Sequence, residues 1–140
     1  MHHACYWIRA PRSASEVEDM QVITTRVHGI IDYVVGALLI LTPFALGFAD
    51  GTAAQWVMIV LGIGTFVVSL ATQYELSVLK LIPMPVHLMG DLAIGVVLLA
   101  SPWVFGFADR VWVPYTLFGV LPFIVVSLSQ RNAPTQALRR

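Results

Sequence analysis

Charge is what this sequence has little of. Only 11% of its 140 residues are charged, whereas 58% are hydrophobic, and the mean hydropathy is +0.80. Soluble globular domains carry about 25% charged residues, which they need to cover a surface that faces water. The composition therefore excludes an ordinary soluble domain and predicts a membrane protein.

Cysteine and recognisable catalytic motifs are also scarce. Cys5 is the single cysteine, which excludes an internal disulfide and a cysteine-based metal motif. No P-loop, dinucleotide fingerprint, nucleophile elbow, zincin motif or nucleic-acid patch is present. We therefore expect no enzymatic activity and no nucleic-acid partner.

The first residues do not form a secretory signal. No apolar core follows Arg9 and Arg12 before the acidic "EVED" at 16–19. Targeting is then expected to rest on the first membrane span itself. Met20 is an alternative start, which would make residues 1–19 an upstream extension.

Four long apolar stretches are present, at 29–49, 53–72, 88–108 and 111–128. Each holds about 18 to 21 residues, enough for a helix that crosses a hydrocarbon layer of about 30 Å. Asp32 and Asp91 are the only formally charged residues inside them. The pattern predicts four membrane-spanning helices.

Basic residues are distributed unevenly between the two sides of these spans. Arg110 falls alone on one side, whereas the other side carries Arg9, Arg12, Arg26, Lys80, Arg131, Arg139 and Arg140. Basic loops are favoured on the cytoplasmic face. Both termini and the middle connector are therefore predicted to be cytoplasmic.

The chain contains one hairpin twice. Residues 27–50 align with 86–109 at an offset of 59, with ten identities in 24 positions, and "VVSL" at 67–70 matches 125–128 with one gap. Because each copy has two spans, both copies enter the membrane from the same side. This predicts an all-α, four-transmembrane-helix bundle built from two parallel-repeat helical hairpins. The expected organisation is an extension (1–26), a repeat (27–73), a connector (74–86), a repeat (87–130) and a tail (131–140).

The repeats also carry a recognisable motif. "SPW" at 101–103, its variant "TPF" at 42–44, the "GFAD" that follows in both copies, and the connector "YELSVLKLIPMPVHL" resemble the SPW-repeat family of small bacterial membrane proteins. The resemblance covers about residues 27–130. It implies two transmembrane helices per repeat, a multi-pass protein of the bacterial inner (plasma) membrane, and no known activity or cofactor. The first copy departs from the motif at Thr42 and Phe44.

Proline in the motif predicts a local weakening of each helix. Pro43 and Pro102 each remove a backbone donor, and the hydroxyls of the preceding Thr42 and Ser101 compensate by bonding a carbonyl one turn back. The aromatic rings that follow, Phe44 and Trp103, are expected near the outer interface. A gating hinge is the alternative to this structural interpretation.

Small and polar residues share one face of the first and third helices. At 100° per residue, the face holds His28, Asp32, Gly36, Pro43 and Gly47, and its copy holds His87, Asp91, Gly95, Pro102 and Gly106. Such residues face other helices in membranes. Gly36, Gly47, Gly95 and Gly106 are therefore predicted packing positions.

The second and fourth helices are expected to pack through small residues as well. Gly62, Thr65 and Ser69 form the predicted seam of the second helix, and the fourth helix is predicted to use Gly119, Pro122 and Ser127. In the connector, Pro83 and Pro85 are expected to prevent helix formation before His87, where the third helix would begin.

The two His-x-x-x-Asp pairs are the candidate functional residues. In the simplest interpretation, His28 and Asp32, like His87 and Asp91, hydrogen-bond each other or a neighbouring helix. Alternatively the four residues form a site for zinc, manganese or iron, since imidazole and carboxylate suit these metals. Tetrapyrrole ligation, a proton relay and a lipid-headgroup or partner contact are further alternatives, and no cofactor is assigned.

These observations favour a structural or accessory protein over a catalyst. We expect it to pack against partner transmembrane helices, a second copy or membrane lipids. A metal- or tetrapyrrole-binding protein and a small carrier or channel are the alternatives.

Overall fold

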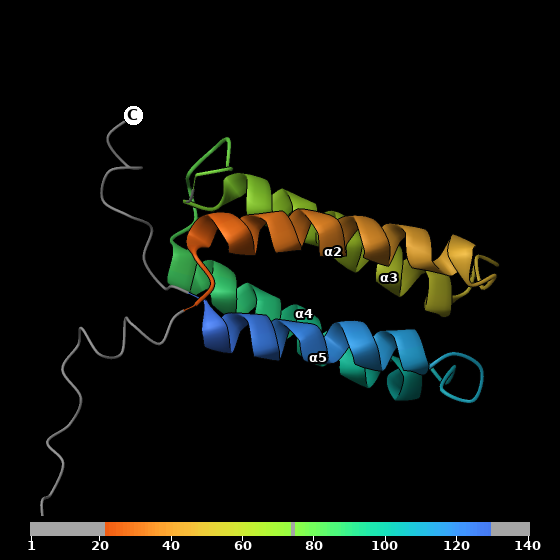
Figure 1. Ribbon diagram of the computed structural model, residues 1–140. Helices are drawn as coiled ribbons and strands as arrows, with labels where there is room; N and C mark the ends of the chain where they lie inside the picture. Colours follow the sequence, from red (N-terminus) through yellow and green to blue (C-terminus); the bar gives the residue numbers. More distant parts are fainter. Residues whose placement is uncertain (1–21, 74, 130–140) are drawn as a thin grey trace, which may run out of the picture.

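Two helical hairpins make up the fold. The computed structural model describes residues 22–73 and 75–129, and these form four helices: α2 (Thr25–Ala45), α3 (Ala53–Ala71), α4 (Met84–Val104) and α5 (Val113–Leu128). The α2–α3 and α4–α5 turns lie at one end of the bundle, and the α3–α4 connector lies at the other (Figure 1). The predicted all-α class with four helices is confirmed. The expectations for Cys5, Met20 and five of the arginines, Arg9, Arg12, Arg131, Arg139 and Arg140, lie outside the described residues.

Three of the four helices are long and apolar enough to cross a membrane. α2, α3 and α4 have 21, 19 and 21 residues, with mean hydropathies of 1.7, 1.9 and 1.7. α5 is equally apolar in character but has only 16 residues. At 1.5 Å per residue its length is about 24 Å, less than the hydrocarbon layer. The chain is a small multi-pass membrane protein whose fourth helix is shorter than predicted.

The first helix of each hairpin begins and ends four residues before its apolar stretch does. Thr24 caps α2 by accepting a hydrogen bond from the backbone N–H of Val27. α4 begins at Met84, so the expectation that it starts at His87 was wrong. Pro85 fits the first turn because the N–H groups there have no partner inside the helix.

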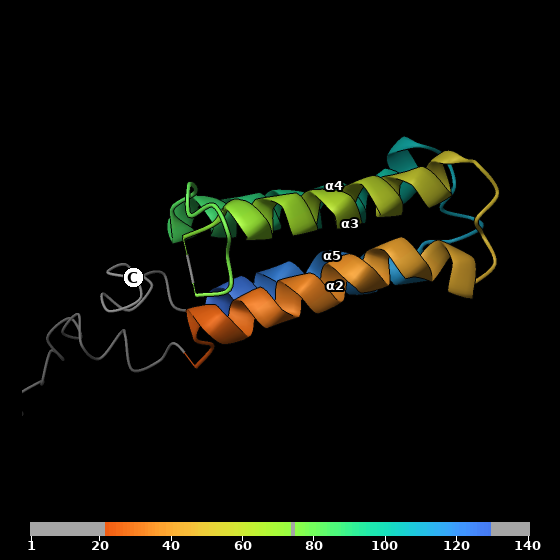
Figure 2. The same cartoon turned by 90° about the horizontal axis from the view of Figure 1, so that it is seen from above.

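Each helix lies beside two others, and like helices of the two hairpins lie diagonally opposite. α2 packs beside α3 and α5, and α4 packs beside α5 and α3 (Figure 2). The His and Asp side chains of α2 and α4 therefore meet across the centre of the bundle. This arrangement decides which side chains can meet there.

Glycines set the close packing inside each hairpin. A Cβ atom added to Gly62 would lie 2.8 Å from the carbonyl oxygen of Gly36, and one added to Gly95 would lie 2.8 Å from that of Gly119. Both distances are shorter than any ordinary contact, so the backbones approach closely only because glycine is present on both helices. This is the close approach that small residues permit in membranes.

Gly47 and Gly106 do not pack between helices, contrary to the prediction. They follow the last residues of α2 and α4 with φ of +73° and +69°, and an added Cβ would meet nothing within 4 Å. Their role is to turn the chain, since glycine adopts positive φ without steric cost.

The second helices of the two repeats align differently from the "VVSL" match. Gly62 and Gly119 occupy equivalent positions, each at the point where the two helices of its hairpin cross. They are 57 residues apart, whereas the "VVSL" match aligns residues that are 58 apart. Ser69 is accordingly buried, whereas Ser127 is exposed and donates to the carbonyl of Phe123 on its own helix. The seam predicted from Gly62, Thr65 and Ser69 is confirmed, but Ser127 does not belong to its counterpart.

The half of the bundle that contains the α2–α3 and α4–α5 turns, which we call the outer half, has an apolar core. Leu39, Met58, Leu98 and Tyr115 are almost fully buried there, and the Tyr115 hydroxyl donates to the carbonyl of Ala54. Because lipid tails are as apolar as these side chains, van der Waals packing stabilises this core. The core holds the two hairpins together from the outer turns up to the polar residues.

The outer turns are joined by an ion pair. Arg110 Nη2 lies 2.5 Å from Asp50 Oδ2, at the surface between the hairpins. A hydrogen bond from the Thr52 hydroxyl, aided by the Thr52 backbone and Arg110, holds the pKa of Asp50 below its usual value. Asp50 therefore stays charged in this turn.

The motif residues divide between the inside and the outside of the bundle. Pro43 and Pro102 are buried, and the hydroxyls before them donate to backbone carbonyls: Thr42 to Leu38 at 2.6 Å, and Ser101 to Leu98 at 3.0 Å. The rings of Phe44 and Trp103 are 58% and 62% exposed. They point away from the core, at the end of the helices that is far from the His-Asp pairs.

The glycine contact makes a direct prediction. Gly62→Ala places a methyl group against the α2 backbone, so it is expected to lower the free energy of unfolding by about 1–3 kcal/mol. Gly64→Ala is the matched control, because a Cβ there meets nothing within 4 Å. Reversible unfolding in mixed detergent measures both, and equal stability of the two variants would contradict the packing described here.

Candidate metal centre

The two His-Asp pairs meet at the centre of the bundle. His28 and Asp32 extend from α2, and His87 and Asp91 extend from the diagonally opposite α4. The exposed fractions are 0%, 6%, 1% and 8% in that order, so all four side chains are buried. One nitrogen or oxygen atom from each residue lies within 4.8 Å of the others. We call these four residues the His₂Asp₂ cluster.

Each imidazole contacts both carboxylates through Nε2. His28 Nε2 lies 3.0 Å from Asp91 Oδ2 and 3.5 Å from Asp32 Oδ1. His87 Nε2 lies 2.8 Å from Asp32 Oδ2 and 3.3 Å from Asp91 Oδ2. The shorter contact of each histidine crosses between the hairpins, so the cluster joins the two repeats.

The other ring nitrogen of each histidine contacts a hydroxyl group. His28 Nδ1 lies 2.7 Å from Ser129 Oγ, and His87 Nδ1 lies 2.9 Å from Thr72 Oγ1. Ser129 and Thr72 are the residues that follow α5 and α3, respectively. Thr72 and Ser129 are 57 residues apart, as are Gly62 and Gly119, so the two hydroxyls occupy equivalent positions in the two repeats.

Backbone hydrogen bonds hold these two hydroxyls in place. Ile23 pairs with Ser129, and Ile82 pairs with Thr72, each in a short parallel bridge. Ile23 and Ile82 both stand five residues before the histidine of their repeat. Each bridge therefore fixes a helix end beside the imidazole that it contacts.

The helix ends also determine which atoms carry the protons. The Thr72 hydroxyl lies 2.7 Å from the carbonyl of Val68, and the Ser129 hydroxyl lies 2.6 Å from that of Val125. These carbonyls lie in the last turns, where the backbone N–H of each capping residue bonds a different carbonyl. Each hydroxyl proton therefore goes to the carbonyl, and the hydroxyl oxygen accepts from the imidazole Nδ1–H.

This assignment leaves the Nε2 lone pairs aimed at the carboxylates. With Nδ1 protonated, a neutral imidazole has a lone pair on Nε2 and no proton there. Lone pairs at 2.8–3.5 Å from carboxylate oxygens repel each other unless a positive charge lies between them. Either additional protons or a metal cation must occupy the centre of the cluster.

The nitrogen–oxygen distances in the cluster match those around a tetrahedral metal ion. Bonds of about 2.0–2.1 Å from zinc to nitrogen and oxygen ligands place neighbouring ligands of a tetrahedron about 3.3 Å apart. The observed Nε2–oxygen distances run from 2.8 to 3.5 Å. Metal-binding histidines commonly donate their second ring N–H to an outer partner, as both do here.

A tetrapyrrole does not fit between the histidines. Two axial imidazoles would need a flat macrocycle between their Nε2 atoms. The carboxylates of Asp32 and Asp91 occupy that space, within 3.5 Å of both nitrogens.

The cluster contains one departure from two-fold symmetry. Ser69 on α3 donates a hydrogen bond to Asp32 Oδ2 at 3.1 Å. Its equivalent on α5 is Val126, which has no polar group. Asp32 therefore receives a hydroxyl hydrogen bond that Asp91 does not receive within residues 22–73 and 75–129.

Sequence reasoning missed the three hydroxyls around the cluster. Ser69 was expected only as a packing residue, and Thr72 and Ser129 were not considered. Aligning Gly62 with Gly119 would also have aligned Thr72 with Ser129, so the signal was present in the sequence.

Comparison with known proteins places the chain in a family. The family model for the SPW repeat domain matches residues 26–129. The chain belongs to the SPW repeat family. Its SPW repeat region covers nearly all of the four helices, which confirms the resemblance seen in the sequence. No curated protein and no solved structure matches the chain.

The SPW motif itself lies far from the cluster. Ser101 stands ten residues after Asp91 on the same helix. At 1.5 Å per residue the two are about 15 Å apart along the axis. The motif that defines the SPW repeat therefore closes the outer end of the helix and takes no part in the His₂Asp₂ cluster.

The contact between the repeats can be tested with a double-mutant cycle. His28→Ala removes the imidazole closest to the buried carboxylate of Asp91, and Asp91→Ala removes the carboxylate closest to the buried imidazole of His28, so each is expected to lower the free energy of unfolding by about 3–5 kcal/mol. The double variant is expected to lose less than the sum of the two. Asp50→Ala, at the outer turn, is the control and should combine additively with His28→Ala. Additive losses for His28 and Asp91 would contradict the contact.

Proposed function

We propose that the protein binds one divalent transition-metal ion, Zn²⁺, Mn²⁺ or Fe²⁺, at the His₂Asp₂ cluster inside the membrane. The observation that carries this proposal is the contact of each Nδ1 with a hydroxyl that lies within hydrogen-bond distance of a helix-end carbonyl. With the hydroxyl proton on that carbonyl, both Nε2 lone pairs are aimed at two buried carboxylates, and four ligand atoms lie within 4.8 Å of one another. Imidazole and carboxylate together suit these three metals.

Charge balance supports a divalent ion. Two carboxylates buried in a membrane bundle carry two negative charges, and isolated buried charges are costly. One divalent cation neutralises both. The hydroxyls of Thr72 and Ser129 then serve as outer partners that orient the imidazoles.

The proposed location is the bacterial inner (plasma) membrane with both termini in the cytoplasm. The distribution of seven basic residues on one side and Arg110 on the other supports this orientation. It places the His₂Asp₂ cluster in the cytoplasmic half of the bilayer and the SPW motif near the outer face.

A structural or accessory role without enzymatic activity is the second candidate. Gly64 and Gly90 favour it, because an added Cβ at either position meets nothing within 4 Å, which leaves room for a partner helix. A partner transmembrane helix or a second copy could approach closely at such positions. In this role the metal would cross-link the two repeats.

A carrier or channel receives less support. Between the cluster and the outer turns, Leu39, Met58 and Leu98 are almost fully buried, and the buried hydroxyls of Thr65 and Ser101 donate to carbonyls of their own helices. An ion would lose its hydration there without gaining ligands.

Metal analysis of matched variants tests the proposal. The protein purified in mild detergent is expected to hold about one equivalent of zinc, manganese or iron by elemental mass spectrometry, and His87→Ala is expected to hold none. Loss of an outer partner typically weakens metal binding by about 10–100-fold, which is the effect expected for Ser129→Ala. Ser127→Ala is the control, because that hydroxyl faces outward. Metal content unchanged in His87→Ala would contradict the proposal.

A further inference from the structure

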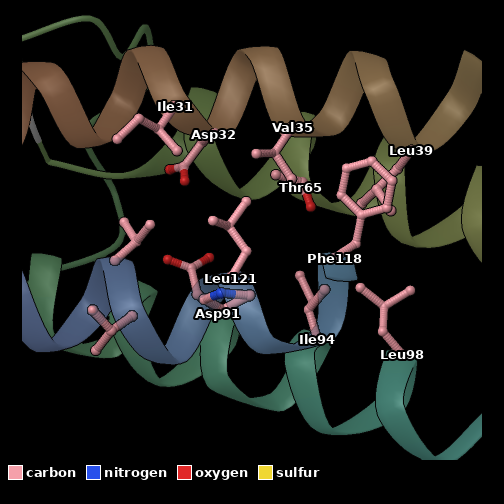
Figure 3. A pocket seen from close by; sticks show the side chains of 13 residues that line it. Ile31, Asp32, Val35, Leu39, Thr65, Asp91, Ile94, Leu98, Phe118 and Leu121 are labelled. Atoms are coloured by element: carbon pink, nitrogen blue, oxygen red, sulfur yellow. The ribbon is translucent and has the colours of Figure 1, made fainter. Parts of the chain in front are cut away.

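A cavity lies between the outer turns of the two hairpins. The space beside Asp91, between α2 and α5, has a volume of only about 30 Å³, which is room for one or two water molecules (Figure 3). The cavity between the outer turns has a volume of about 290 Å³, close to the lower end of the range of about 300–1,000 Å³ typical of ligand pockets. It is lined by the beginning of α3, at 52–54, and by residues of the turn after α4, at 105–110. We call this space the turn cavity.

The turn cavity is open to the surroundings at the ends of membrane-spanning helices. Of the residues that line it, Phe105 is 56% exposed, and Asp109 and Arg110 are exposed as well. A Cβ atom added to Gly106, another lining residue, would meet nothing within 4 Å. α4 ends just before the cavity and α3 begins beside it, so the cavity lies at the level where a bilayer has its headgroups.

Charges of both signs line the turn cavity. The guanidinium of Arg110 has five N–H donors, and its contact with Asp50 is made through Nη2. Asp109 is the other charged residue, and its carboxylate makes no hydrogen bond or ion pair with any residue within 22–73 and 75–129. The cavity therefore combines a carboxylate that has no protein partner with a guanidinium that has donors to spare.

Asp109 differs in this respect from its copy in the first repeat. Asp50 ends the first "GFAD" and accepts hydrogen bonds from the hydroxyl and the backbone N–H of Thr52. Asp109 ends the second "GFAD", where the residue two positions later is Val111, which has no hydroxyl. Backbone hydrogen bonds to the carbonyl of Phe107 close this second turn instead. The carboxylate of Asp109 is therefore not needed to close its turn, and it is available to a ligand.

These charges indicate the chemistry of the ligand. Asp50, Asp109 and Arg110 give the two turns two negative charges and one positive charge, so a headgroup with a net negative charge is not favoured. A primary ammonium group donates hydrogen bonds to a carboxylate, and phosphate oxygens accept them from a guanidinium. A quaternary ammonium group has no N–H to donate. The matching ligand carries a phosphate and a primary ammonium group on a short link.

We infer that the turn cavity binds the headgroup of a phospholipid of the phosphatidylethanolamine type. The ammonium group donates to Asp109, and the phosphate accepts from Arg110. The exposed rings of Trp103 and Phe105 stand at the end of the same helix, where the acyl chains of a bound lipid enter the bilayer. Aromatic residues are favoured at this level of a membrane. The inference requires neither the metal site nor a particular orientation of the protein.

Competition between lipids with the same acyl chains tests the inference. The protein in mild detergent is mixed with equal amounts of dioleoyl phosphatidylethanolamine, phosphatidylcholine and phosphatidylglycerol, and native mass spectrometry measures which lipid it retains. Phosphatidylethanolamine is expected to be retained about two- to fivefold more than phosphatidylcholine, the effect of one partly exposed ion pair. Phosphatidylglycerol, which has no ammonium group, is expected to be retained least.

Variants of the charged residues locate the binding. Asp109→Asn is expected to bring the ratio of phosphatidylethanolamine to phosphatidylcholine to about one, and Asp109→Lys to favour phosphatidylglycerol. Asp50→Asn is the matched control, because it removes the same charge from a residue that does not line the cavity, and it is expected to keep the preference. Arg110→Gln is expected to lower the retention of all three lipids, whereas Arg26→Gln, at the other end of the bundle, is expected to change none.

Two results would overturn the inference: equal retention of the three lipids by the wild-type protein, or an unchanged preference in Asp109→Asn. Glycerophosphoethanolamine, the same headgroup without acyl chains, is expected to leave the retained lipid in place at equal concentration, and displacement would contradict a lipid ligand. Metal content measured in the same samples separates this inference from the metal proposal. A preference for phosphatidylethanolamine in samples without metal contradicts the metal proposal alone.

Discussion

Two aspartates buried at the centre of a membrane bundle require positive charge beside them, and the imidazoles that face them do not supply it while they are neutral. The hydroxyls of Thr72 and Ser129 give their protons to helix-end carbonyls and so fix the imidazole protons on Nδ1. The rest of the structure depends on how this charge is balanced. If protons balance the charge, the cluster is a hydrogen-bonded cross-link between the repeats. If a divalent cation balances it, the cluster is a metal centre that also joins the repeats.

The remaining features bring the four residues into register. Glycine contacts at Gly36–Gly62 and Gly95–Gly119 set the spacing inside each hairpin. The backbone bridges at Ile23–Ser129 and Thr72–Ile82 place a hydroxyl beside each histidine. The apolar core and the SPW motif close the outer half of the bundle. Because both hairpins contain the same glycine contact and the same backbone bridge, an imidazole and a carboxylate from each repeat reach the same point.

Much of this was predictable from residues that occur twice at one offset. The repeated His, Asp, Gly and Pro predicted two parallel hairpins, and the helical period placed His28, Asp32, Gly36 and Pro43 on one face. The sequence did not reveal that Gly47 belongs to a turn, because an apolar stretch continues past the helix end. The hydroxyl partners escaped prediction because the "VVSL" match hid the true register of the second helices. The turn cavity depends on how the hairpins pack, which no local pattern records.

The most direct test of the central claim is X-ray absorption at the zinc edge, recorded on the purified protein loaded with one equivalent of Zn²⁺. A cation held by the His₂Asp₂ cluster predicts a first shell of four nitrogen and oxygen atoms at about 2.0–2.1 Å. The spectrum should also contain the outer-shell scattering of two imidazole rings. A sulfur ligand, which only Cys5 or a methionine could supply, or a shell of oxygen atoms without imidazole, would contradict the account.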